Sequence, residues 1–179
     1  MKDWASELDA ITEQFLTSFG GYSSEQLNWK PNYQTWSIAQ NIDHLIAVNE
    51  SYYPVLVSLN EGTHKTPFIA KFGFMVSFLG KTILKAVNED RKKKMKTFPI
   101  WEPTAGDLDG GILQRLEKHQ TQLKRHMEAS LDLINKGVVI SSPANKNIVY
   151  TLEAAFDIIV SHERRHLEQA KQVVKDMKK

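Results

Sequence analysis

Two histidines one helical turn apart stand in the stretch S-H-E-R-R-H-L-E-Q, residues 161–169. His162 and His166 are related as i and i+4, and Glu163 lies between them. On a helix such a pair shares one face, with side chains about 5–6 Å apart, so both imidazoles can bind one metal ion. Both flank the apolar stripe of the helix, whereas two solvated histidines would occupy the opposite face. The pair therefore predicts a metal site inside the fold.

The same stretch matches H-E-x-x-H, the zinc-binding motif of metalloproteases. Those enzymes need a third protein ligand downstream of the motif. Residues 167–179 contain no histidine; Glu168 faces away, and Asp176 lies nearly three turns along the same helix. The chain also shows no evident sheet to hold a peptide substrate. We therefore do not interpret the motif as that of a protease, and expect the third ligand upstream.

The best upstream candidate is His44, in W-S-I-A-Q-N-I-D-H-L, because it too flanks an apolar helical stripe. Three neutral imidazoles would leave an ion with open positions, as in catalytic rather than structural sites. His119 and His126 are seven residues apart, about 10 Å along a helix axis, too far to share an ion. We expect them to be polar groups at the edge of the helical packing.

Glu163 lies nearer the middle of its apolar stripe than either neighbouring histidine. A buried carboxylate must be paired, protonated or close to a metal, because an isolated buried charge is very costly. Three readings stay open: a candidate catalytic base, a group supporting the metal ligands, or a salt bridge to a lysine or arginine.

Helical periodicity supplies the elements that must position these residues. Part of residues 68–88 is expected to be helical, a short strand is expected at 138–140, and Gly137 suits a helix end. Thr35 or Ser37 can cap the second long helix and Thr151 opens the last. Residues 61–106 form a long, aromatic crossover expected to act as a lid. The pattern predicts an all-α antiparallel four-helix bundle with this crossover between its second and third long helices. The long helices are expected at residues 3–20, 37–60, 107–136 and 151–178.

Composition limits the protein class. The 179 residues suit one domain, 1–179, and the absence of cysteine excludes disulfides, thiolate zinc sites and a cysteine nucleophile. The start lacks a signal-peptide pattern, no apolar run approaches the roughly 20 residues that cross a bilayer, and the net charge is only +2. We expect a cytoplasmic protein with neither membrane nor nucleic-acid partner. The run R-K-K-K-M-K, 91–96, is interpreted as a solvated lid segment, the alternative being a nucleic-acid or membrane contact.

The W-S-I-A-Q-N-I-D-H-L and S-H-E-R-R-H-L-E-Q-A stretches together resemble the DinB/YfiT-like superfamily, and the resemblance extends from the first helix through Gln169. It implies an up-down-down-up four-helix bundle, often a homodimer, that holds a divalent metal on three histidines. Carried over, the ligands are His44, His162 and His166. Characterised relatives include enzymes that use a low-molecular-weight thiol such as bacillithiol or mycothiol.

The functional expectation is a divalent-metal-dependent enzyme, a thiol S-transferase acting on a small-molecule substrate. The alternatives are a metal-dependent hydrolase with Glu163 as base, and a non-enzymatic stress or binding protein. Three histidines suit zinc, nickel or iron about equally. Trp29, Trp36 and Trp101 can line a pocket or belong to the core.

Overall fold

The computed structural model describes residues 2–88 and 97–178, so the basic run at 91–96 lies outside the described residues. The fold is mostly helical, as the sequence predicts, with one small two-stranded sheet. In chain order the elements are α1 (Trp4–Phe19), α2 (Ser24–Asn28), α3 (Ile38–Glu50), α4 (Tyr53–Asn60), the 3-10 helix η1 (Phe68–Lys71), α5 (Gly73–Val87), the 3-10 helix η2 (Pro99–Trp101), α6 (Ile112–Ala129), α7 (Leu131–Asn135), β1 (Val139–Ser142), β2 (Asn145–Thr151) and α8 (Leu152–Met177).

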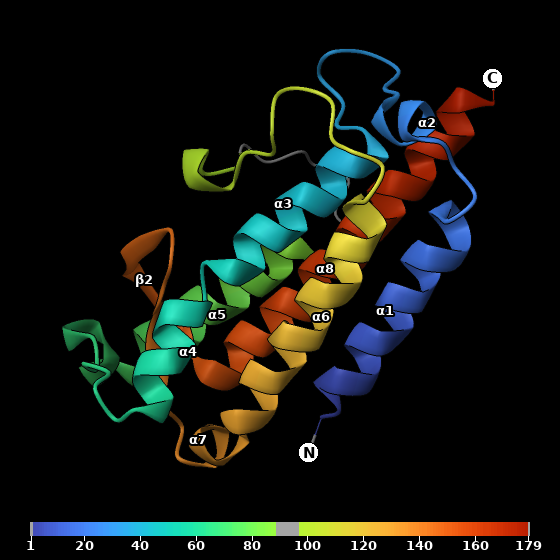
Figure 1. The fold of residues 1–179 in the computed structure, drawn as a ribbon. Coiled ribbons are helices and arrows are strands. Elements are labelled where there is room, and N and C mark those ends of the chain that lie inside the picture. The colour runs from blue at the N-terminus through green and yellow to red at the C-terminus, as the bar shows by residue number, and fades with distance from the viewer. Residues whose placement is uncertain (1, 89–96, 179) are drawn as a thin grey trace.

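The core lies between α1, α3, α6 and α8, which lie side by side (Figure 1). α1 packs against α6 and α8, and α3 packs against the same two helices. In Figure 1, α1 and α8 run toward the end that carries the C-terminus, whereas α3 and α6 run the other way. The apolar stripes meet between them, and the fully buried side chains include Leu8, Phe15, Ile42, Leu45, Leu116 and Phe156.

Two of the predicted helices are each divided in two. The helix expected at 37–60 ends at Glu50 and resumes at Tyr53, because Pro54 has no backbone N–H and its ring would clash with the Glu50 carbonyl. The helix expected at 107–136 begins only at Ile112, after two glycines, and is interrupted at Ser130. The Ser130 hydroxyl donates a hydrogen bond of 2.8 Å to the carbonyl of His126, a bond that bends helices.

Helix ends follow the predicted caps. Ser37, not Thr35, caps α3: its hydroxyl accepts from the Gln40 backbone N–H at 3.1 Å, in a full capping box. Thr151 caps α8, accepting from the backbone N–H of Ala154 at 3.1 Å. Gly137 follows α7 with φ of +63°, the left-handed conformation that favours glycine. The caps at Ser37 and Thr151 fix where α3 and α8, the helices that carry the three predicted metal ligands, begin.

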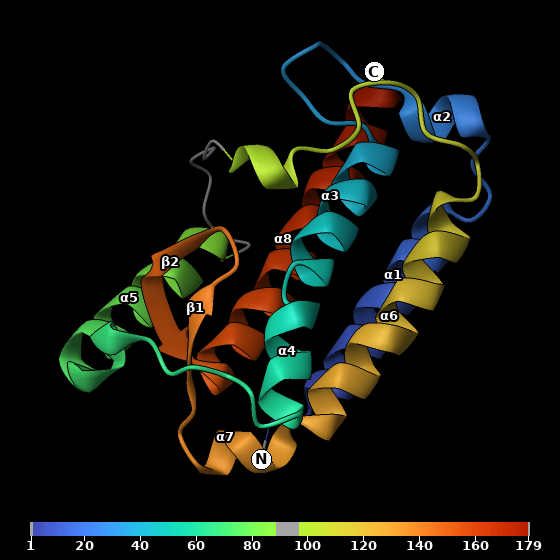
Figure 2. The same ribbon diagram turned by 60° about the vertical axis from the view of Figure 1, so that its left-hand side comes forward.

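The crossover contains the helix expected near 68–88, as η1 and α5. In Figure 2, α5 lies at the edge of the molecule beside the β1–β2 hairpin, and it packs against both β2 and α8. β1 lies close to the strand expected at 138–140, but β2, its antiparallel partner, was not predicted. The close approach depends on Gly80, where an added Cβ would lie 3.2 Å from the Cβ of Tyr150.

Candidate metal centre

The three predicted ligands come together. The Nε2 atom of His162, on α8, lies 3.3 Å from Nε2 of His44, on α3, and 3.0 Å from Nε2 of His166. Within the described part of the chain, these three form the one group of metal-ligating side chains whose ligand atoms all lie within 4.8 Å of one another. His44 and His166 are buried, and His162 is partly exposed. Distant segments of the chain therefore build one site.

The three imidazoles are held in the neutral form that can bind a cation. Burial lowers the pKa of His44, and lowers the pKa values of His162 and His166 well below that of an ordinary histidine. Positive charge on the neighbouring groups lowers the last two pKa values further. All three imidazoles are therefore neutral near pH 7, the form that binds metals.

Hydrogen bonds orient two of the rings. Nδ1 of His44 lies 2.6 Å from the carbonyl oxygen of Trp101 and must donate to it. Nδ1 of His166 lies 2.8 Å from Oδ1 of Asn41 and donates there. The amide of Asn41 is itself oriented, because its Nδ2 donates to the Ser37 carbonyl at 2.8 Å. With both protons on Nδ1, the two Nε2 atoms present lone pairs to the centre, as in known metal sites.

The spacing also fits an ion. Zinc binds imidazole nitrogen at about 2.0–2.1 Å, and tetrahedral geometry then places neighbouring nitrogens about 3.3 Å apart. The observed separations of 3.0 and 3.3 Å are close to that value. Nδ1 of His162 is buried without a hydrogen-bond partner among the described residues, so no hydrogen bond at Nδ1 fixes the tautomer of this ring. These distances are compatible with one divalent cation held by all three side chains.

Polar residues of α3 and its C-cap residue, Ser51, hold the end of the crossover over this site. Gln40 Nε2 donates to the Thr104 carbonyl at 2.9 Å. Asp43 Oδ2 accepts from both the backbone N–H and the hydroxyl of Thr104 at 2.9 Å. Trp101 Nε1 donates to the Ser51 hydroxyl at 3.1 Å. These bonds place the Trp101 carbonyl where it fixes the ring of His44.

Two tryptophans border the centre. The Trp36 ring lies 4.7 Å from the ring of His44 and stacks on His166 at 5.8 Å. Trp101 reaches the site through its backbone carbonyl, and Trp29 packs against the core instead. Of the three tryptophans expected to line a pocket or belong to the core, Trp36 is therefore the one whose ring lies against the histidines.

Glu163 lies outside the histidine group. Its carboxylate is fully buried and accepts hydrogen bonds from Asn49 Nδ2 at 2.7 Å and Gln120 Nε2 at 2.5 Å. Burial raises its pKa to about 7, although the two amides act in the opposite direction. It has no lysine or arginine partner among the ion pairs of the described residues. Two carboxamides, rather than a cation, stabilise this buried acid.

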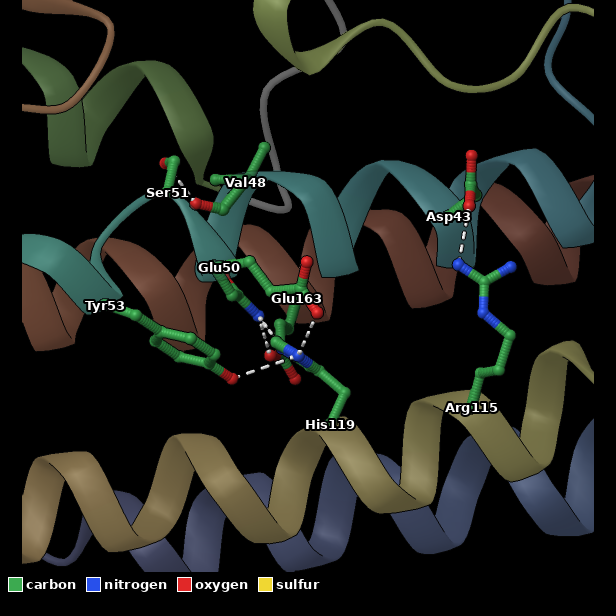
Figure 3. Close-up of polar contacts among 9 residues, drawn as sticks. Asp43, Val48, Glu50, Ser51, Tyr53, Arg115, His119 and Glu163 are labelled. Atoms are coloured by element: carbon green, nitrogen blue, oxygen red, sulfur yellow. Dashed lines mark hydrogen bonds and ion pairs between the residues drawn. The ribbon is translucent and has the colours of Figure 1, made fainter.

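His119 belongs to the same buried polar cluster, so its expected place at the edge of the packing is wrong. Only 3% of His119 is exposed. Its Nε2 lies 3.3 Å from Nδ2 of Asn49, and its Nδ1 lies 3.1 Å from the hydroxyl of Tyr53 (Figure 3). His126 is partly buried and its ring packs 4.5 Å from that of Tyr53. The sequence offered one signal for this cluster, namely polar residues within the apolar stripes of α3 and α6.

Comparison with known proteins decides the family. The family model described as the DinB superfamily matches residues 7–170. The chain belongs to the DinB superfamily. It is similar to the uncharacterized protein YuaE of Bacillus subtilis strain 168, with 29% identity over 154 residues, 86% of each chain. No solved structure matches it significantly. The matched region of this DinB-superfamily member includes all three histidines of the candidate metal centre.

Proposed function

We propose that this protein is a divalent-metal-dependent enzyme whose metal is held by His44, His162 and His166 in an up-down-down-up helical bundle. One observation carries the proposal: three neutral imidazoles from two helices converge, and the Trp101 carbonyl and Asn41 orient two of them. A purely structural histidine cluster would not need fixed lone pairs directed at a common point. Imidazole ligands suit zinc, nickel and iron.

The reaction we favour is transfer of a low-molecular-weight thiol of the bacillithiol type to an electrophilic small molecule. The thiol loses its S–H proton to solvent, its sulfur forms a bond to an electrophilic carbon of the substrate, and the leaving group on that carbon departs with the bonding electron pair. A bound divalent ion lowers the pKa of a coordinated thiol, so that thiolate forms at neutral pH. The chain has no cysteine, so the thiol must come from a cofactor. Trp36 contributes an aromatic wall beside His44 and His166, against which an apolar part of a substrate can pack.

Hydrolysis is the weaker alternative. It would need a base such as Glu163 beside the metal-bound water. Both oxygens of that carboxylate accept hydrogen bonds from Asn49 and Gln120, in the separate polar cluster. This arrangement favours a role for Glu163 in holding α3, α6 and α8 together. A non-enzymatic binding protein with the same metal site is the third reading, and the experiment below separates it from the first.

Cobalt-substituted protein tests the thiol proposal. Addition of bacillithiol is expected to produce an intense near-ultraviolet sulfur-to-cobalt charge-transfer band, whereas the S-methylated thiol produces none. His162→Ala should abolish the band. A cobalt-loaded protein that shows no band with the free thiol would reject the thiol reaction and leave only the metal site. Thiol binding without consumption of any electrophile in a panel would favour the binding protein.

Two further features belong to this proposal. We infer a homodimer from the family resemblance, to be tested by light scattering. We also infer that residues 61–106 act as a lid of a single domain, since their Trp101 contacts His44 directly. Replacing Thr104, whose backbone and hydroxyl bind Asp43, with valine is expected to loosen this contact and weaken metal binding. Unchanged metal affinity in that variant would argue against the lid.

A further inference from the structure

The outer face of η1 and α5 carries four exposed phenylalanines. Phe68 is 69% exposed, Phe72 44%, Phe74 75% and Phe78 68%. Phe74 and Phe78 are four residues apart on α5 and so share one side of the helix. Contiguous exposed apolar side chains are uncommon on a surface without a partner. This face is therefore a candidate binding surface.

The exposure does not come from a loosely packed helix. The opposite side of α5 buries Val76, Gly80 and Ala86 and packs on α8 and β2. Gly80 lets α5 approach the Cβ atoms of Tyr150 and Ala154 closely, so the inner face has no room for the phenylalanines to turn inward. Figure 2 shows α5 on the periphery, with the hairpin and α8 on its inner side.

Lysines share the face with the phenylalanines. Lys71, Lys81 and Lys85 are exposed, and the Lys71 ammonium lies 4.9 Å from the centre of the Phe68 ring. Lys81 and Lys85 continue the stripe of Phe74 and Phe78, since steps of four, three and four residues stay on one side of a helix. Residues 62–88 contain no aspartate or glutamate. The face is therefore both aromatic and uniformly cationic.

We propose that this aromatic–lysine face binds the surface of an anionic membrane. Phenylalanine side chains enter the boundary between headgroups and acyl chains, and lysines bind lipid phosphates. A second copy of the chain fits less well, because a symmetric contact would bring the same lysines together, and residues 62–88 offer no carboxylate to pair with them. Within the described residues no helix is long and apolar enough to cross a membrane. The proposed contact is peripheral and needs no membrane-spanning segment.

Vesicle co-sedimentation of the full-length protein tests the proposal. We expect binding to vesicles of phosphatidylcholine with phosphatidylglycerol, and much weaker binding to phosphatidylcholine alone. Lys81→Gln/Lys85→Gln should weaken binding to the anionic vesicles about 25-fold at low salt, since each lysine contributes about fivefold. Phe74→Ser/Phe78→Ser should weaken binding to both kinds of vesicle, by about tenfold or more. These four residues are exposed, so the variants are expected to fold, which circular dichroism checks.

Matched controls lie elsewhere on the surface. Lys118→Gln on α6 and Tyr33→Ser, at a residue that is 88% exposed, remove the same kinds of side chain and should bind like the wild type. Equal losses in these controls would overturn the proposal. The proposal would also be overturned if the wild type were a dimer that Phe74→Ser/Phe78→Ser converts to monomers. Two other results would contradict it: binding of the protein to nucleic acid but not to vesicles, and a loss of vesicle binding only when the lysines of residues 91–96 are neutralised.

Discussion

Acid should destabilise this fold through His119. Burial lowers the pKa of His119 from 6.5 to about 4. The hydroxyl of Tyr53, the amide of Asn49 and the carboxylate of Glu50, 3.8 Å away, face its ring. In the unfolded chain the imidazole takes up a proton near pH 6.5, whereas in the fold it stays neutral down to about pH 4. The unfolded state therefore binds more protons in this window, and stability falls as pH falls.

The size of the effect follows from the shift. A change of about 2.5 pKa units, at 1.36 kcal/mol each, corresponds to about 3 kcal/mol of folding free energy lost between about pH 6.5 and pH 4. The variant to compare is His119→Gln, which keeps a polar side chain but cannot titrate. Urea unfolding of both proteins, with metal removed by a chelator, gives the free energy of unfolding at each pH.

The difference between the two proteins isolates His119. The histidines of the metal centre titrate in both proteins, so their contributions largely cancel in the subtraction. We expect the stability advantage of the wild type to shrink by about 3 kcal/mol from pH 6.5 to pH 4. Gln122→Ala, an uncharged change on the same helix, should shift stability by a constant amount. A wild-type advantage that is constant or grows on acidification would refute the buried, neutral assignment of His119.

Three other predictions concern the metal centre and the packing of α5. Asn41→Leu, which removes the hydrogen-bond acceptor of His166 Nδ1, should weaken metal affinity about 10- to 100-fold by competition titration, whereas Asn41→Asp should keep most of it. Gly80→Val should cost about 1–3 kcal/mol in urea unfolding, since its side chain meets Tyr150, while Gly73→Val, in open space, should cost less. Loading the wild type at a free metal concentration about 100 times Kd should raise its free energy of unfolding by about 3 kcal/mol, and a chelator should remove that gain. The stability of His44→Ala should not change on chelation.

The spacing of apolar residues predicted the long helices, because a helix forms where it can bury an apolar stripe. The ends of a helix depend instead on individual residues such as proline, glycine and capping side chains. Pro54 and the glycines at 110 and 111 are visible in the sequence, and a stricter use of them would have divided or shortened the two affected helices. β2 was not predicted, because its polar first half has no alternation and its strand conformation depends on pairing with β1.

The convergence of the three histidines could be predicted because His162 and His166 lie on one helical turn and His44 flanks an apolar helical stripe, a choice that the family resemblance supported. The groups that orient the triad could not be predicted in the same way. Asn41 contacts a residue 125 positions away, and Trp101 acts through its backbone carbonyl, which every residue possesses. The same holds for the cluster around Glu163, whose donors Asn49 and Gln120 come from two other helices. Only the packing of α3, α6 and α8 reveals these partners.

Metal content of the untagged protein, measured by mass spectrometry beside His44→Ala and His166→Ala, tests the central claim most directly. A tag must be absent, because its own histidines would bind metal. The converging imidazoles predict close to one divalent ion per chain in the wild type and its loss in both variants. A wild type that is free of metal and also fails to bind added zinc, nickel or iron would contradict the metal centre, and with it the proposed enzyme.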